Sequence, residues 1–264
     1  MSMLAAELQR LLVQRDLHIL FQPIVNTTLG TALGYEALVR GPEESPLHEA
    51  NALFAIAQAE GQLLQLEMLC RELAIQRFTE LQLPAKLFLN VSPMALLDRH
   101  HHSGETIRMV EHYGLNPERV VIELSERYPT PDMSLLTMAT RHYAGMGFQI
   151  AIDDLGAGYS GLKLWSEITP DFVKIDRHFV AGLDGDRIKR EFVRFIRDIA
   201  GRIGCQVIAE GIETAEEYRA LLELGVTKLQ GFYLGRPTVE PQLVLTPPQP
   251  LRRFQPGELL PVMV

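Results

Sequence analysis

The sequence predicts an α/β fold in which eight strands close into a barrel surrounded by helices. Short apolar runs of strand length alternate with longer stretches of helical periodicity, as in a chain of repeating βα units. About eight such runs occur, which is the number that a (βα)8 barrel of the TIM type needs. Most of the runs also end in a polar side chain, and barrel enzymes build their sites at that end of the strands. The length of 264 residues fits one such domain.

The expected elements follow one another along most of the chain. Residues 1–14 are expected to form a helix that leads into a barrel domain at residues 15–240. The strand-like runs are His18–Val25, Leu33–Arg40, Lys86–Val91, Val120–Leu124, Gln149–Asp153, Phe172–Ile175, Gln206–Ala209 and Lys228–Tyr233. Helical patterns lie near Ala52–Glu80, Ser103–His112, Pro131–Met146, Asp186–Ile203 and Ala215–Leu224. Residues 241–264 are rich in proline, which predicts a tail or a truncated linker.

The composition excludes several classes of protein. Apolar residues make up 47% of the chain and charged residues 22%, so there is enough apolar surface to bury, and disorder is excluded for most of the chain. The net charge of −8 argues against binding to a nucleic-acid polymer through its phosphates. Cys70 and Cys205 are too few for a disulfide framework, and no apolar run reaches about 18 residues. We therefore expect a cytoplasmic chain without a membrane segment.

Polar side chains recur at the ends of the strand-like runs. A single charged residue in a strand is usually a solvated edge position. Seven of the eight runs, however, carry a carboxylate, an amide or a lysine near their ends, which is harder to explain in that way. The residues are Glu36, Asn90, Glu123, Asp153, Asp154, Lys174, Glu210 and Gln230. In a closed barrel these side chains would meet at one mouth and form a site.

The charges of these residues predict a metal site. Five carboxylates at one mouth would raise one another's pKa steeply unless cations share the site. Two divalent ions (+4) and Lys174 (+1) would balance the five negative charges. Hard oxygen ligands favour Mg²⁺ or Mn²⁺ over zinc, and Ca²⁺ is expected to inhibit because its coordination is longer and looser. Two such ions suit a displacement at phosphorus.

Seven ordered motifs carry a resemblance to a known family. They are Glu36-Ala37-Leu38-Val39-Arg40, Leu89-Asn90-Val91-Ser92-Pro93, Glu123-Leu124-Ser125-Glu126, Asp153-Asp154-Leu155-Gly156-Ala157-Gly158-Tyr159-Ser160, Lys174-Ile175-Asp176, Ala209-Glu210-Gly211-Ile212-Glu213-Thr214 and Gln230-Gly231-Phe232-Tyr233-Leu234-Gly235-Arg236-Pro237. Over roughly residues 15–240 the chain resembles the EAL family of cyclic di-GMP phosphodiesterases. The resemblance implies a modified TIM barrel with an antiparallel first strand, which hydrolyses cyclic di-GMP to linear pGpG.

The same resemblance implies roles for individual residues. The implied metal ligands are Glu36, Asn90, Glu123, Asp153, Asp154 and Glu210. Lys174 would hold the attacking water, and Glu210 is also the candidate general base. The implied substrate-binding residues are Leu38, Arg40, Gln230, Arg236 and Pro237, with Arg40 on a phosphate and Leu38 and Pro237 beside the guanines. Glu126 and Glu213 would anchor the loop Leu155–Ser160, which in the family couples dimerisation to metal binding.

Two segments depart from the usual family pattern. In the loop, Leu155, Ala157 and Gly161 replace an aromatic residue, a threonine and a serine. Because alanine cannot donate a side-chain hydrogen bond, we expect a looser loop and a weak homodimer whose activity rises with protein concentration. The sequence after Arg40 resembles the variant in which an EAL domain starts a longer chain. Fused sensory or cyclase domains are therefore expected beyond the C-terminus.

Four other interpretations are weaker. The glycines at 156, 158 and 161 match a dinucleotide-binding pattern, but the two preceding aspartates would repel a pyrophosphate. A Schiff-base lysine needs a lowered pKa, and carboxylates would raise the pKa of Lys174. The run His100–His102 lies in a polar stretch without partner ligands, which favours a solvated loop. A receptor or scaffold that binds cyclic di-GMP without cleaving it has usually lost a ligand carboxylate, whereas this chain keeps the full set.

Overall fold

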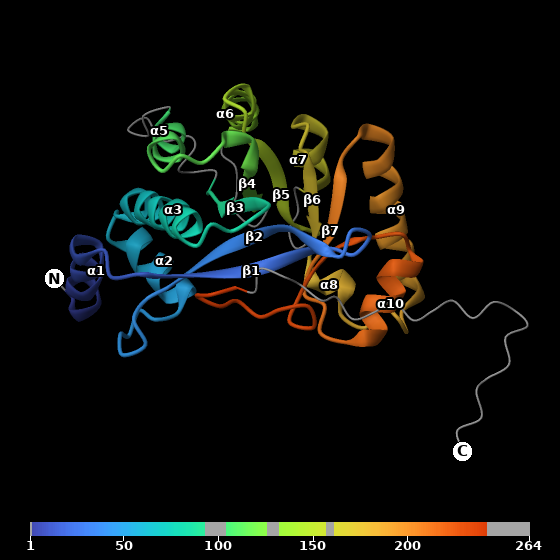
Figure 1. The fold of residues 1–264 in the computed structure, drawn as a ribbon, viewed down its shortest axis with the longest axis horizontal. Coiled ribbons are helices and arrows are strands. Elements are labelled where there is room, and N and C mark those ends of the chain that lie inside the picture. Colours follow the sequence, from blue (N-terminus) through green and yellow to red (C-terminus); the bar gives the residue numbers. More distant parts are fainter. Residues whose placement is uncertain (1, 93–103, 126–131, 157–160, 242–264) are drawn as a thin grey trace, which may run out of the picture.

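The computed structural model describes residues 2–92, 104–125, 132–156 and 161–241, and eight strands close into a barrel in sequence order. The strands are β1 (His18–Asn26), β2 (Thr31–Arg40), β3 (Lys86–Asn90), β4 (Val120–Ser125), β5 (Gln149–Leu155), β6 (Phe172–Ile175), β7 (Gln206–Ala209) and β8 (Lys228–Gln230). β1 pairs antiparallel with both β2 and β8, and the remaining neighbours are parallel. The expected barrel with an antiparallel first strand is confirmed. In Figure 1 the long β1–β2 hairpin crosses the molecule.

Helices cover the outside of the barrel. They are α1 (Met3–Gln14), α2 (Ala50–Ala59), α3 (Leu63–Glu80), α5 (Glu105–His112), the 3₁₀ turn Pro117–Arg119, α6 (Met133–Gly145), α7 (Gly161–Glu167), α8 (Arg177–Val180), α9 (Arg187–Ile203) and α10 (Ala215–Glu223). Local sequence sets several of their ends. Thr214 and Glu217 form a reciprocal capping box at the start of α10, and Gly204 ends α9 in the left-handed conformation (φ 77°). No helix among the described residues is both long and apolar enough to cross a bilayer.

The structure corrects two expected elements. The helical pattern near Ala52–Glu80 corresponds to two helices, because Gly61 takes a left-handed conformation (φ 68°) and separates α2 from α3. The last strand ends at Gln230 rather than at Tyr233. A Cβ on Gly231 would lie 2.2 Å from the backbone of Ile212, so the chain turns closely over the segment after β7 at that point. The short helices α7 and α8 were absent from the expected elements, and their brevity gives little periodicity to detect.

Apolar side chains form two layers, one on each face of the barrel wall. The larger one lies between the strands and the helices and includes Leu87, Leu89, Ile122 and Ile152. The smaller one fills the inside of the barrel, with one residue from each of β1, β3, β4, β5, β6 and β7: Ile24, Phe88, Val121, Ala151, Phe172 and Ile208. Phe88 and Phe172 meet edge to face, with ring centroids 5.6 Å apart. This layer closes the barrel beneath its C-terminal mouth.

Candidate active site

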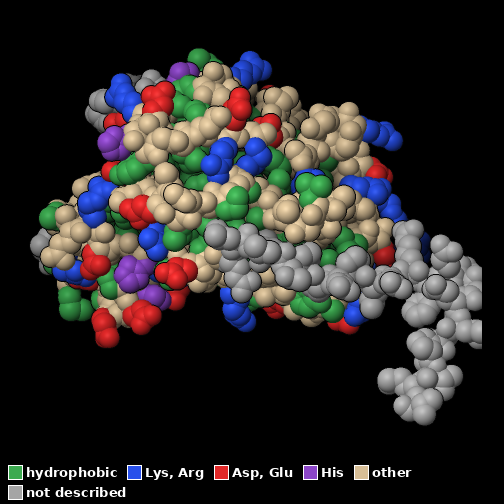
Figure 2. All heavy atoms as spheres, in the orientation of Figure 1, with side chains coloured by type: hydrophobic (Ala, Val, Ile, Leu, Met, Phe, Trp, Pro, Cys, Tyr) green, Lys and Arg blue, Asp and Glu red, His purple; other side chains and the backbone are tan. Residues whose placement is uncertain are grey.

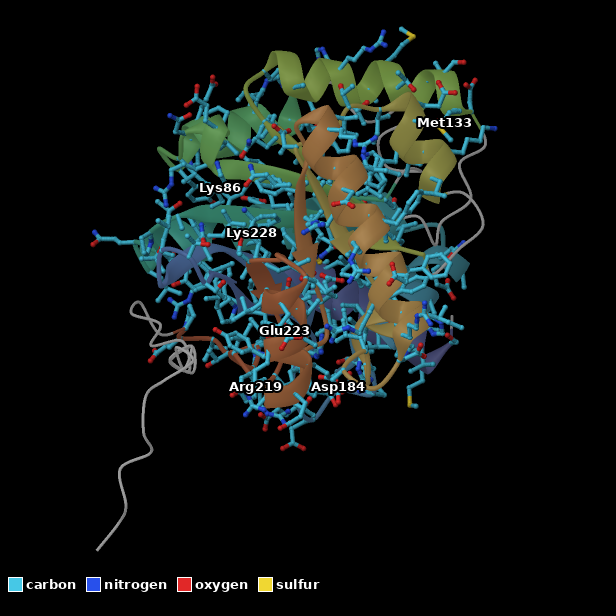
Figure 3. The ribbon with its side chains drawn as sticks, turned by 90° about the vertical axis from the view of Figure 1, so that its right-hand side faces the viewer. Lys86, Met133, Asp184, Arg219, Glu223 and Lys228 are labelled. Atoms are coloured by element: carbon cyan, nitrogen blue, oxygen red, sulfur yellow. The ribbon has the colours of Figure 1, made fainter. Side chains whose placement is uncertain are left out.

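The candidate site is the layer of inward-facing side chains that follows the inner apolar layer toward the C-terminal mouth of the barrel. Side chains alternate along a strand, so the residue two positions after an inner-core residue also points inward. On β3 to β6 these residues are Asn90, Glu123, Asp153 and Lys174, and Glu210 directly follows the end of β7. Glu36 from β2 and Gln230 from β8 complete the ring and are both buried. The opposite end of the barrel is marked by Lys86 and Lys228, which begin β3 and β8 (Figure 3).

Lys174 lies at the centre of the ring and contacts four carboxylates. Its Nζ is 2.7 Å from Glu123 Oε1 and 2.7 Å from Glu210 Oε1. It is 3.2 Å from both Glu36 Oε2 and Asp153 Oδ1. The lysine is fully buried, and so is Glu123, whereas the side chain of Glu210 is 17% exposed. The arrangement places one positive charge against four negative ones.

Glu36 is held by amides as well as by Lys174. Its Oε1 accepts a hydrogen bond from Asn90 Nδ2 at 2.9 Å, and its Oε2 accepts one from Gln230 Nε2 at 2.6 Å. Gln230 also donates to Gln22 Oε1 at 3.2 Å, and Gln22 donates to the carbonyl of Gly235 at 3.1 Å. The carboxylate is therefore fixed in position from three strands.

The environment moves the pKa values of the cluster in opposite directions. Burial alone would lower the pKa of Lys174, but the carboxylates of Asp153, Glu123 and Glu210 outweigh it and hold that pKa well above the usual value. Burial, together with neighbouring carboxylates, raises the pKa of Glu123 and Glu210 well above the ordinary range. Burial would also raise the pKa of Glu36, yet Lys174 and the amide donors lower it. A lysine with a raised pKa keeps its proton, which argues against the Schiff-base interpretation.

The donor set fits divalent cations. Carboxylate oxygens of Glu36, Glu123 and Asp153 lie within 4.8 Å of one another, and so do those of Asp153, Asp154 and Glu210. Glu123 Oε2 and Gln230 Oε1 are buried without a hydrogen-bond partner in the described part of the chain. Unpartnered buried oxygens are costly unless a cation or water satisfies them. Excess negative charge and unsatisfied oxygen atoms together match what Mg²⁺ or Mn²⁺ requires.

A cavity of about 460 Å³ opens beside this ring, between the β2–β3 edge and helices α2 and α3. Its lining includes Leu38, Arg40, Phe54, Gln58 and Asn90. Arg40 lies 3.8 Å from the exposed Glu49 and donates to the carbonyl of Val39. The cavity is apolar along most of its wall and carries two guanidinium groups, Arg40 and Arg71, together with the carboxylate of Glu67. An apolar wall with charged groups suits a ligand that combines flat apolar groups with a negative charge.

Other predicted residues are not among the contacts of the ring given above. Arg236 is exposed and lies over the ring of Phe232 at 4.3 Å, in the segment after β8 that also holds Pro237. Glu213 pairs with Arg177 of α8 at 2.8 Å. Its role as an anchor of the loop stays a prediction. Glu126, Ala157 and the run His100–His102 lie outside the described residues.

Two residues near the site were missed by sequence reasoning. Gln22 bridges Gln230 and Gly235 through hydrogen bonds. Its position two residues before the inner-core Ile24 on β1 is the sequence feature that could have identified it. Because β1 runs antiparallel, this inward position precedes the core residue instead of following it. Ser125, at the end of β4, donates to Asp154 Oδ2 at 2.9 Å.

The comparison with known families agrees with this geometry. The EAL domain matches the chain over residues 5–237. The chain belongs to the EAL family. A relative of this EAL domain, the probable cyclic di-GMP phosphodiesterase PdeI of Escherichia coli, is 31% identical over 229 residues, which are 84% of the chain and 29% of that protein. The chain spans between 20% and 35% of the length of the first four curated relatives that it matches.

Solved structures of other EAL proteins superpose on the barrel. The MucR phosphodiesterase of Pseudomonas aeruginosa in complex with c-di-GMP is 26% identical, with a TM-score of 0.80, over 90% of this chain and 98% of that one. Klebsiella pneumoniae BlrP1, in a complex with manganese and cyclic di-GMP, is 28% identical, with a TM-score of 0.78, over 84% of this chain and 56% of that one.

Proposed function

We propose that this EAL domain hydrolyses cyclic di-GMP to linear pGpG in a reaction that requires divalent cations. The observation that carries the proposal is the buried ring of carboxylates around Lys174, whose negative charge exceeds the single lysine charge. Manganese and cyclic di-GMP occur together in the BlrP1 complex, which supports the same ligands here. The proposed cation ligands are Glu36, Asn90, Glu123, Asp153, Asp154 and Glu210. A bound pair of cations supplies positive charge that activates water and stabilises the negative charge developing on a phosphodiester.

Lys174 and Glu210 take different parts in the proposed reaction. Lys174 keeps its proton because surrounding carboxylates raise its pKa, so it can hold a water molecule or a charge but cannot accept a proton. Glu210 has a raised pKa and is the most exposed of the four carboxylates that contact Lys174. We assign it the removal of a proton from the attacking water, in addition to its place among the cation ligands.

The cavity beside the ring is the proposed place for one half of the substrate. A cyclic dinucleotide combines two flat bases with two negative charges. Leu38 offers apolar contact to a base, and Arg40 offers a charge to a phosphate from the same face of β2. Gln230, Arg236 and Pro237 would contact the other half across the mouth. On the face shown in Figure 2, basic and acidic side chains of the described residues are interspersed, which does not favour a nucleic-acid polymer as the ligand.

The proposal extends to the whole protein in two respects. The relatives are longer than this chain, so fused sensory or cyclase domains that control the reaction are part of the proposal. We also propose that the protein forms a homodimer. In this dimer the loop at residues 155–160 would respond to the partner subunit.

The test compares the wild-type chain with Glu210→Ala. We expect the wild type to convert cyclic di-GMP to pGpG with Mg²⁺, and the variant to bind the nucleotide in a calorimetric titration while releasing no pGpG. Glu216→Ala, which changes an exposed glutamate on α10, is the matched control and should keep its activity. A wild-type chain that binds cyclic di-GMP but forms no pGpG with Mg²⁺ or Mn²⁺ would establish the receptor interpretation instead.

A further inference from the structure

Two consecutive aspartates at the end of β5 serve the same site, which a regular strand does not allow. Successive side chains of a strand point to opposite faces, so Asp153 and Asp154 should diverge. Their carboxylate oxygens, with one from Glu210, nevertheless all lie within 4.8 Å of one another. A local departure from strand geometry must therefore turn Asp154 toward the mouth of the barrel.

The backbone shows where this departure occurs. The pairing of β5 with β6 shifts register between Ile152 and Leu155, as in a β-bulge. Within that interval Asp154 takes a left-handed conformation, with φ 57°. Most residues resist this conformation, whereas aspartate and asparagine adopt it more readily because their short polar side chains can form local hydrogen bonds. The conformation persists when neighbouring groups hold it in place.

Ser125 is a neighbouring group that contacts the Asp154 carboxylate. It ends β4, lies beside Asp153 in the β4–β5 register, and donates from Oγ to Asp154 Oδ2 at 2.9 Å. The bond joins the end of one strand to the bulge of the next.

We propose that Ser125 is a positioning residue of the metal centre: its hydroxyl orients Asp154 in the bulge, so that two consecutive aspartates converge on one cation site. The inference rests on the proposed function, because it assigns Asp154 to a cation. Groups that orient a ligand in this way typically change metal affinity by about 10–100-fold when they are removed.

The test isolates the hydroxyl with two variants of the same shape, Ser125→Thr and Ser125→Val. Both side chains are β-branched and suit a strand, so the two substitutions should affect folding to the same extent. Binding of Mn²⁺ to the nucleotide-free chain is measured by calorimetry. We expect Ser125→Thr to bind Mn²⁺ within about threefold of wild type and Ser125→Val to bind at least about tenfold more weakly. Ser166→Ala removes an exposed hydroxyl on α7 and should bind like wild type.

Equal Mn²⁺ affinity in the threonine and valine variants would overturn the proposal, and so would a wild-type chain that binds no Mn²⁺. Turnover gives a second measurement. Ser125→Val should require more Mn²⁺ for half-maximal rate, with an unchanged KM for cyclic di-GMP at saturating Mn²⁺. If the wild type binds Mn²⁺ with the expected differences among variants but cleaves no cyclic di-GMP, the phosphodiesterase function fails while the role of Ser125 stands.

Discussion

The most unusual residue in the molecule is Lys174, a fully buried lysine within 3.2 Å of four carboxylates. A buried charge is tolerated only when opposite charges and hydrogen bonds replace its lost hydration. Here the charges do not balance, since four carboxylates surround one lysine and leave an excess of negative charge. The site is consequently built to take up further positive charge, which is the physical basis of the proposed dependence on divalent cations.

Replacing Lys174 by methionine tests this compensation. Lys174→Met leaves four carboxylates without their shared cation, and we expect the free energy of unfolding without metal to fall by about 3–5 kcal/mol. Mn²⁺ should restore part of the loss, because it supplies the missing charge. Urea denaturation with Mn²⁺ and with EDTA measures both effects. Lys163→Met, at an exposed position on α7, is the control and should change little. Equal stability of Lys174→Met and Lys163→Met in EDTA would contradict this account.

The raised pKa values of Glu123 and Glu210 predict that cation binding releases protons. A carboxyl whose pKa is raised keeps its proton to a higher pH, and a cation binds only the ionised form. Affinity for Mn²⁺ should therefore weaken as the pH falls and these carboxyl groups take up protons. Calorimetry in two buffers of different ionisation enthalpy counts the protons released. An apparent binding enthalpy that is the same in both buffers would show that no proton leaves.

At the scale of elements, the N-terminal helix is attached through a small ionic network. Arg10 of α1 bonds Glu7, and Ser45 in the segment before α2 donates to the same glutamate at 2.7 Å. These bonds, led by the one from Arg10, lower the pKa of Glu7 from 4.5 to about 2. The network ties α1 to the polypeptide that follows β2.

Glu7→Gln should lower the free energy of unfolding by about 0.5–1 kcal/mol at pH 7. Because the folded pKa lies below the unfolded one, the contribution of Glu7 is fully present above pH 4.5 and is lost as the pH falls toward 2. Denaturation of both proteins at several pH values measures the difference. A stability gap that stays constant from pH 7 to pH 3 would show that the ionised Glu7 is not its source.

Elements of regular length were predictable, and local irregularities were not. The polar ends of the strand-like runs located the ring residues. Five of these residues lie two positions after an apolar inner residue, as Glu123 does after Val121. The break at Gly61 was missed since helical periodicity continues on both sides of it. The convergence of Asp153 and Asp154 depends on a bulge and a left-handed residue, which propensity does not encode. The contacts of Gln22 required knowledge of which strands are neighbours in the closed barrel.

At the scale of the whole molecule, the site is assembled from strands that lie far apart in the sequence. Glu36 and Gln230, which share a hydrogen bond, are 194 residues apart along the chain. Their strands, β2 and β8, both pair with β1, which closes the barrel between them. Cation binding should therefore favour the complete barrel over any partly closed form.

This coupling predicts that cations stabilise the entire fold. Trp165 is the only tryptophan and is buried, so its fluorescence reports on unfolding of the barrel wall. Mn²⁺ at about 100 times its Kd should add about 2.7 kcal/mol to the free energy of unfolding and raise Tm by several degrees. The fluorescence and circular dichroism transitions should coincide and shift together. A Tm unchanged by Mn²⁺ would mean that no cation binds the folded barrel.

The most direct test of the central claim is the initial rate of pGpG formation from cyclic di-GMP, measured against Mg²⁺ concentration for the wild type and for Glu123→Gln. Glu123 is fully buried and contacts Lys174, so this change removes one charge from the ring and leaves the shape of the side chain. We predict no rate in EDTA, saturable activation of the wild type by Mg²⁺, inhibition by Ca²⁺, and a rate at least about 100-fold lower in the variant. Wild-type turnover in EDTA, or near-normal turnover of Glu123→Gln at modest Mg²⁺, would contradict the account.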